Sequence, residues 1–112
     1  MLALPDAERR KLEAQLHEQL RQDCDQSEAI GYRPKIFRQM LAESGPVEAC
    51  LRVIMTDKIP DGFITLLEKK RLDLTAEATI LRGPWRVLFQ STELDRARNR
   101  LRQYGRPDLA VP

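Results

Sequence analysis

The chain has 112 residues, of which 42% are hydrophobic and 32% are charged, and its formal net charge is +2. This length is typical of one domain, and the apolar content is sufficient for a hydrophobic core. No apolar run approaches the roughly 18 residues of a membrane-spanning helix. Residues 1–6 lack the basic start and apolar stretch of a signal peptide. We therefore expect a cytoplasmic protein without a membrane partner.

The first predicted element is a long helix over residues 5–27, a segment rich in strong helix formers. Leu12, Leu16 and Leu20 recur every four residues and form a narrow apolar stripe. Leaving these leucines exposed would forgo about 1.5–3 kcal/mol of burial for each, so we expect the stripe to be covered. The cover is predicted to be the rest of the chain or an antiparallel second copy. Residues 1–30 are interpreted as a contact or oligomerisation element.

Glycine and proline divide residues 31–106 into short segments that are predicted to form a compact helical domain. Pro34 is expected to begin a second helix, which Gly45 ends, and Pro46 is expected to begin a third. Apolar residues recur at helical spacing in both segments.

Residues 53–67 permit two interpretations. Apolar residues flank a turn at residues 60–62, and this arrangement is compatible with a β-hairpin. The apolar residues after the turn also have helical spacing, and Asp61 is a suitable helix N-cap. We favour a helix, a loop and a second helix.

Residues 76–81 are predicted to form a short helix that Asp73 or Thr75 caps. Gly83 and Pro84 then interrupt the helical pattern. The large apolar groups that lie on separate predicted helices along the chain are expected to be buried together. This expected core contains Phe37, Phe63, Trp85, Phe89 and Leu101.

The last predicted helix begins with Thr92 and Asp95, which resemble a capping box, and it ends at Gly105. Residues 107–112 are expected to be a disordered tail. The complete pattern predicts an all-α bundle of six to seven short-to-medium helices with a long N-terminal helix.

A combined pattern of motifs runs through the central and C-terminal segments. It consists of Gly31-Tyr32-x-Pro34-x-x-Phe37-x-x-Met40, Asp61-Gly62-Phe63-x-x-Leu66, Arg71-Leu72-Asp73-Leu74-Thr75-x-Glu77, Leu88-Phe89, Glu93-Leu94-x-x-Ala97 and Arg100-Leu101-x-x-Tyr104-Gly105. The pattern resembles a family of small uncharacterised bacterial helical proteins and domains. This resemblance implies an intact helical domain and a bacterial source, and it carries no activity, cofactor or catalytic residue onto this chain.

The residue types that perform catalysis are not clustered. His17 is the only histidine and is expected on a helix surface. Cys24 and Cys50 are too few for a disulfide framework and are not spaced as metal ligands, so we expect buried thiols. Asp61 and Asp73 are interpreted as helix caps. We therefore predict no enzyme activity, catalytic residue, metal site, cofactor or small-molecule substrate.

Four arginines, Arg96, Arg98, Arg100 and Arg102, alternate along the last predicted helix and are expected to cover much of its solvent face. Like charges four residues apart repel by about 0.2–0.5 kcal/mol, so helix stability alone does not favour this pattern. It is compatible with a solvated basic face or with a surface that binds an anionic partner.

A basic triplet, Lys69, Lys70 and Arg71, precedes the predicted helix at residues 76–81. One interpretation is structural, with Arg71 paired to Asp73 or Glu77 across the turn. The other is a surface loop in which the three cations contact a partner.

These features favour a small bacterial cytoplasmic protein-interaction or adaptor module without catalytic activity. The expected partner is another protein or a second copy of the chain, bound through the leucine stripe. The alternative is a nucleic-acid-binding accessory protein that uses the arginines of the last helix. The near-neutral charge and the small number of aromatic residues argue against this alternative.

Overall fold

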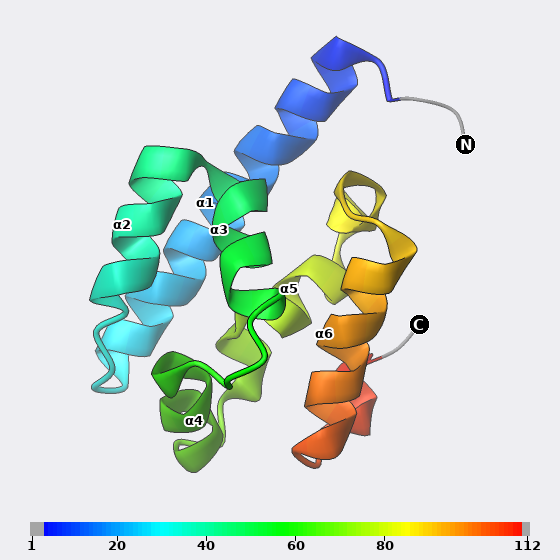
Figure 1. The fold of residues 1–112 in the computed structure, drawn as a ribbon. Coiled ribbons are helices and arrows are strands. Elements are labelled where there is room, and N and C mark those ends of the chain that lie inside the picture. The colour runs from blue at the N-terminus through cyan, green and yellow to red at the C-terminus, as the bar shows by residue number, and fades with distance from the viewer. Residues whose placement is uncertain (1–3, 111–112) are drawn as a thin grey trace.

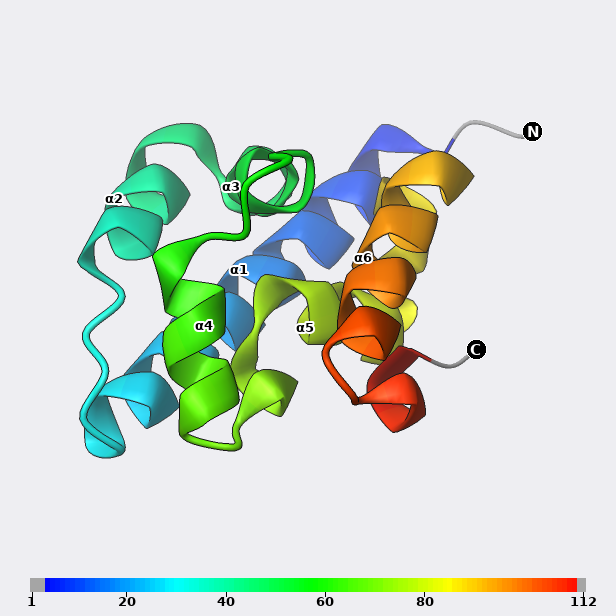
Figure 2. The ribbon, with the colours of Figure 1, turned by 60° about the horizontal axis from the view of Figure 1, so that its bottom comes forward.

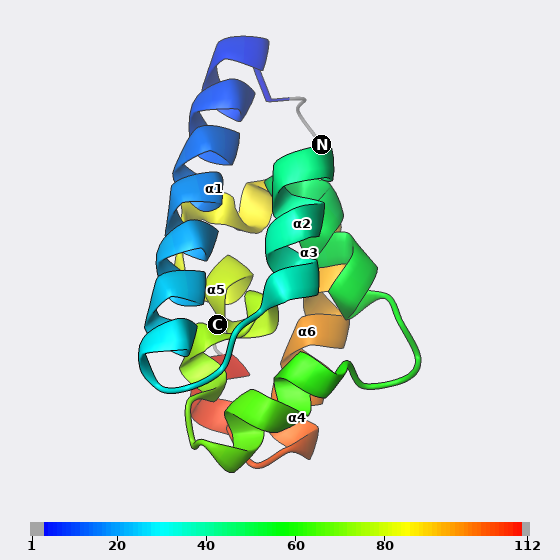
Figure 3. The same ribbon diagram turned by 90° about the vertical axis from the view of Figure 1, so that its left-hand side faces the viewer.

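The fold begins with one long helix on which the other elements pack. In this computed structural model, which describes residues 4–110, α1 spans Asp6–Ala29 (Figure 1). It is followed within the described residues by five shorter α-helices and three short 3-10 helices. The first turns of α1 project beyond the other elements, and its second half runs beside α2 (Lys35–Ser44), as Figures 1 and 3 show.

The leucine stripe of α1 packs into the core of its own chain. The exposed fractions of Leu16 and Leu20 are 0% and 1%, and Leu12 is partly buried against the same core. Buried Cys24 and Ser27 continue the stripe toward the end of the helix. The packing expected for this stripe is therefore intramolecular, so Leu16 and Leu20 offer no surface to a second copy in this fold.

The helices α2 and α3 (Pro46–Ile54) form a hairpin that turns at a single residue, Gly45. Gly45 has a φ of 85°, in the left-handed region that favours glycine. Its N–H donates to the carbonyl of Leu41, and Pro46 occupies the start of α3. Pro34 precedes the first residue of α2. The expected starts of both helices are confirmed to within one residue.

Residues 53–67 form a helix, a loop and a helix, as the favoured interpretation predicts. The first helix ends at Ile54, and α4 spans Asp61–Glu68. The role expected for Asp61 is wrong, because Pro60 holds the N-cap position and no side chain caps this end. Asp61 is the first residue of the helix, where its negative charge suits the helix dipole.

The short helix α5 (Ala76–Arg82) lies in the middle of the bundle, with α4 and α6 on either side in Figure 2. Every residue from 76 to 81 is buried. The 3-10 helix η1 (Leu72–Leu74) precedes it, and Thr75 caps it by accepting the N–H of Ala78 at 3.2 Å. Of the two expected caps, Thr75 is therefore confirmed.

The 3-10 helix η2 (Pro84–Leu88) leads into α6 (Ser91–Gln103). The capping box expected at Thr92 and Asp95 is wrong in position. It is formed by Gln90 and Glu93, whose carboxylate accepts the N–H of Gln90 at 2.8 Å. Because the chain is extended at Phe89 and at the N-cap Gln90, the turn into the helix occurs before Thr92.

The disordered tail expected for residues 107–112 is wrong for its first four residues. These form a 3-10 helix, η3 (Pro107–Ala110), after Gly105, which has a φ of 86°. The exposed fraction of Ala110 is 0%, because apolar side chains of this segment pack onto the bundle. Residues 111–112 lie outside the described residues.

The hydrophobic core draws on every α-helix of the described chain. Of the five large groups expected there, Phe63, Trp85, Phe89 and Leu101 are buried, whereas Phe37 is only partly buried. Because α1 shares this core, the expected boundary at residue 30 does not separate two packing units. The radius of gyration is 13.3 Å, close to the roughly 13 Å expected for one compact domain of this length. Among the residues described, none of the helices combines the length and apolarity needed to cross a membrane.

Candidate functional site

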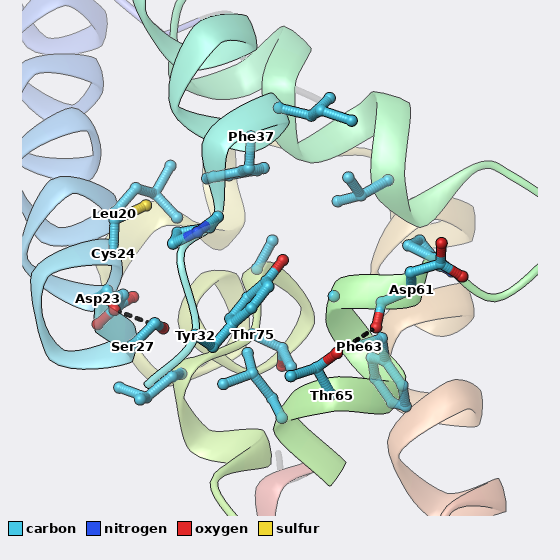
Figure 4. A pocket seen from close by; sticks show the side chains of 18 of the residues that line it. Leu20, Asp23, Cys24, Ser27, Tyr32, Phe37, Asp61, Phe63, Thr65 and Thr75 are labelled. Atoms are coloured by element: carbon cyan, nitrogen blue, oxygen red, sulfur yellow. Dashed lines mark hydrogen bonds between the residues drawn. The ribbon is translucent and has the colours of Figure 1, made fainter. Parts of the chain in front are cut away.

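A pocket of about 490 Å³ opens where α1, α2, α4 and the start of α5 meet (Figure 4). Its walls come from residues 20–27, 32–40, 60–66 and 74–77, together with Val53. The volume lies in the range of pockets that hold small molecules or single large side chains. The fold therefore brings four separate segments around one hollow.

Three of the sequence motifs described above meet at this pocket. The motif residues that line it are Tyr32, Pro34, Phe37, Met40, Asp61, Gly62, Phe63, Leu66, Leu74, Thr75 and Glu77. The motifs of the last helix take no part in the lining. Residues of three motifs that are separate in the sequence thus line the same pocket.

The pocket wall is mostly apolar. Figure 4 shows Leu20 and Phe37 on one side and Phe63 on the other, with Tyr32 between them. Phe63 is fixed by an edge-to-face contact with Tyr104 of the C-terminal part, at 5.3 Å between ring centroids. A rigid aromatic wall of this kind favours the binding of an apolar group.

Tyr32 reaches across the pocket to the backbone of α4. A methyl group added at Gly62 would overlap the Tyr32 hydroxyl, so the missing side chain of Gly62 makes room for the phenol. Partial burial raises the pKa of Tyr32. No group among residues 4–110 hydrogen-bonds this hydroxyl, which leaves it available to a ligand.

The substitution Gly62→Ala is therefore expected to displace the Tyr32 ring. Alanine is the better helix former by up to about 1 kcal/mol, so the unfolding free energy should stay within about 1 kcal/mol of the parent. The aromatic NMR resonances of Tyr32 should shift, whereas in a Tyr32→Leu background the same substitution should have no comparable effect on the pocket. Unchanged Tyr32 resonances in Gly62→Ala would contradict this close packing.

Asp23 lies beside the pocket, but its carboxylate is already bonded within the protein. It accepts hydrogen bonds from Thr79 at 2.5 Å, from Gln19 at 3.0 Å and from Arg82 at 3.2 Å. Burial raises the pKa of this carboxyl, and the three donors oppose that effect. Asp23 thus fixes α1 to α5, and its oxygens are not free to act as a base toward a ligand.

Behind the pocket, Glu77 and Arg100 form a buried ion pair. Arg100 donates to Glu77 at 2.8 Å, and the exposed fractions of the two side chains are 7% and 3%. Arg100 also donates to the carbonyls of Val53, Ile54 and Thr56, at 2.8, 3.3 and 2.7 Å. Burial raises the pKa of Glu77, although the adjacent guanidinium opposes the shift. This cluster joins α5 and α6 to the end of α3.

The expected solvent-facing position is wrong for Arg100. Its neighbour Arg96 is half-buried and donates to the carbonyls of Ile54 and Thr56, at 3.2 Å each. Both guanidiniums therefore satisfy backbone oxygens at the negative end of the α3 dipole. The sequence could not indicate this role, because the acceptors lie about 40 residues away in the chain.

The other two arginines of α6 also form bonds inside the chain. Arg98 pairs with Asp95 at 3.0 Å, and Arg102 donates to Asn99 at 3.3 Å. A nucleic-acid interface built on these arginines stays a prediction. The internal contacts do not favour it, because a guanidinium already bonded to the protein has fewer donors for phosphate.

The basic triplet follows the end of α4, near the loop between α1 and α2. Arg71 pairs with Asp73 through bonds of 3.0 and 3.1 Å, so the structural interpretation is confirmed for this residue. Lys69 and Lys70 are exposed. A methyl group added at Gly31 would lie 3.4 Å from the Lys69 ammonium, which places this cation beside the loop before Tyr32. Contact of Lys69 and Lys70 with a partner stays a prediction.

The mouth of the pocket combines an exposed apolar side chain with charges. Ile36, at the start of α2, has an exposed fraction of 74%. Arg33 and Lys35 flank it, and Asp61 lies on the α4 side. A second hollow of about 320 Å³ shares Val53, Pro60 and Asp61 with the pocket and is also lined by Lys58. The two hollows thus share wall residues at the end of α3 and the start of α4, and we call them together the groove.

Neither cysteine is placed as a nucleophile. Cys24 lines the pocket but is 3% exposed, and burial raises the pKa of its thiol to about 11. Cys50 is fully buried, and burial raises its pKa further. His17 does not line the pocket. In the part of the chain that the structure describes, no three His, Cys, Asp or Glu side chains are grouped to hold a metal ion.

Both thiols are expected to be unreactive in the native protein. A thiol-specific chromogenic reagent at mildly alkaline pH should detect neither Cys24 nor Cys50 until the chain is unfolded in denaturant, because the thiolate is the reactive form. If one thiol of the folded protein reacts with the reagent as fast as an exposed cysteine does, the pocket wall opens at Cys24.

Comparison of the chain with protein-family models, with curated proteins and with solved structures gave no match.

Proposed function

We propose that this protein is a non-catalytic interaction module, a small cytoplasmic adaptor in bacteria, whose pocket binds an apolar side chain of a protein partner. The observation that carries the proposal is the apolar pocket of about 490 Å³ beside an isoleucine that is 74% exposed. Burial of one large apolar side chain in a complex contributes up to about 1.5–3 kcal/mol to its stability.

The polar groups around the pocket support binding over catalysis. The buried carboxylates of Asp23 and Glu77 are bonded to internal donors. The hydroxyls of Ser27 and Thr75 donate to backbone carbonyls of their own chain. A catalytic base or nucleophile needs a free functional atom near the reacting group, and these side chains do not supply one.

The shape of the groove favours a protein partner over a small molecule. The pocket and the second hollow adjoin, because both are lined by Val53 and Pro60. Ile36 stands at the rim, where a small ligand held in the pocket would leave much of it exposed. A peptide segment with one large apolar anchor can fill the pocket and cover the rim together.

The proposal can be tested by selecting peptides from a random displayed library against three immobilised proteins. The parent is compared with Ile36→Glu, which places a charge at the rim, and with Val87→Glu as a matched control. Val87 is 57% exposed on η2 and lines neither hollow. Both substitutions lie at exposed positions, so both variants are expected to fold.

The expected result is that the parent and Val87→Glu enrich the same peptides, which share a bulky apolar residue, and that Ile36→Glu does not. Enrichment of the same peptides by Ile36→Glu would place the binding surface elsewhere. No enrichment by the parent above an unrelated helical protein would reject peptide binding.

A further inference from the structure

We infer that the partner segment carries acidic residues on both sides of its apolar anchor, and that a basic rim around the groove reads them. The basic rim consists of Arg33, Lys35 and Lys58. This inference rests on the proposed function of the same pocket and adds the charge of the partner.

The cations of the basic rim are not used inside the protein. Among residues 4–110, none of the three forms an ion pair or a side-chain hydrogen bond with a neighbour. Arg38, one turn after Lys35 on α2, differs because it pairs with Asp25 at 2.6 Å and Glu28 at 2.8 Å of α1. The α1 carboxylates are therefore held by Arg38, and the rim cations face solvent.

The acidic groups near the groove do not neutralise the rim. Glu77 and Asp23 are bonded to Arg100 and Arg82 inside the bundle. Asp61 lines both hollows from the first residue of α4, so this one carboxylate stands against the three cations of the rim. The first turn of α2 contains no acidic residue and has no side-chain cap, so its dipole adds to the positive potential of Lys35.

The positions of the cations fit a charge on each side of the anchor. Arg33 and Lys35 border the pocket from the start of α2. Lys58 borders the second hollow from the loop between α3 and α4. A partner whose anchor fills the pocket therefore meets cations from two separate elements. Exposed charges of this kind select the partner and speed its association more than they add affinity.

The test uses three short synthetic peptides with the same Phe-Leu anchor and different flanks. The flanks are Glu pairs, Gln pairs or Lys pairs, and binding is measured by fluorescence anisotropy at low and high salt. At low salt the Glu peptide is expected to bind roughly tenfold more tightly than the Gln peptide, and the Lys peptide more weakly than both. The preference should decrease at high salt, because exposed charges are screened.

A charge-matched pair of variants assigns the preference to the rim. The triple variant Arg33→Gln/Lys35→Gln/Lys58→Gln should bind the three peptides with similar affinity. The control, Arg10→Gln/Lys11→Gln/Arg21→Gln, removes three exposed cations of α1 that line neither hollow and should keep the preference.

The outcomes separate the two proposals. If all three peptides bind the parent equally, the interaction module stands and the acidic partner is rejected. If no peptide binds even at high protein concentration, peptide binding itself is rejected, and the inference fails with it. A single-stranded oligonucleotide that displaces the Glu peptide from the parent and from the control triple variant alike would replace the acidic peptide with a general anion at this rim.

Discussion

Replacing Arg100 by leucine is expected to lower the unfolding free energy by about 3–5 kcal/mol, because the buried carboxylate of Glu77 would lose its cation. The same change removes donors from the carbonyls at the end of α3. Urea unfolding followed by circular dichroism measures the loss. The matched control is Arg102→Leu on the exposed face of the same helix, which should change the free energy by no more than about 0.5 kcal/mol.

The loss in Arg100→Leu is also expected to depend on pH. Without the guanidinium, burial is opposed only by a backbone hydrogen bond to Glu77, so it raises the pKa of this carboxyl further above the ordinary value of 4.5. The neutral form is then favoured in the folded state, so the variant is least impaired below pH 4.5 and loses stability as the pH rises through the folded pKa. A Glu77→Gln/Arg100→Leu double variant should lack this slope. An equal loss at all pH values, or a loss no larger than that of Arg102→Leu, would contradict the buried ion pair.

The second large effect is expected for Phe63→Ala, which should cost about 3–5 kcal/mol of unfolding free energy. Phe63 is 4% exposed, packs edge-to-face on Tyr104 and joins α4 to the core. Its removal extends the existing pocket into the core. Thermal and urea unfolding measure the change, with Ile36→Ala as the control, because that side chain is 74% exposed. If Phe63→Ala melts within a few degrees of Ile36→Ala, Phe63 does not support the core.

The helical architecture could be predicted from the sequence because local signals determine it. Gly45 and Gly105 adopt the positive φ angles that their positions after helices require. Pro46 starts a helix because it needs no N–H partner there. Boundaries that depend on competing polar residues were less predictable, since Gln90 and not Thr92 caps α6.

The roles of the arginines on α6 could not be predicted, because they depend on what other elements present to that helix. Helical periodicity places Arg100 and Arg102 about 200° apart around the helix axis, and it does not indicate which of the two sides is covered. The cover comes from Glu77 and from the last carbonyls of α3, which meet Arg100 only after the chain has folded.

The pocket was not predicted for a related reason. Phe37 and Met40 have the spacing of core residues, and the same spacing serves a wall that borders a hollow. The difference depends on the volume that remains between helices. Here Tyr32 packs against Gly62 at the pocket wall, and no local sequence pattern indicates that these two residues are close.

The connection of Arg100 to α3 and α5 has a consequence for synthesis on the ribosome. Translation proceeds from the amino end, so α1 to α5 emerge while α6 is still inside the exit tunnel of the ribosome. During that interval the carboxylate of Glu77 has no cation, and the last carbonyls of α3 have no donors from α6. A nascent chain that ends before Arg100 therefore exposes core leucines without being able to close over them. We therefore expect the fold to complete only after α6 has left the exit tunnel.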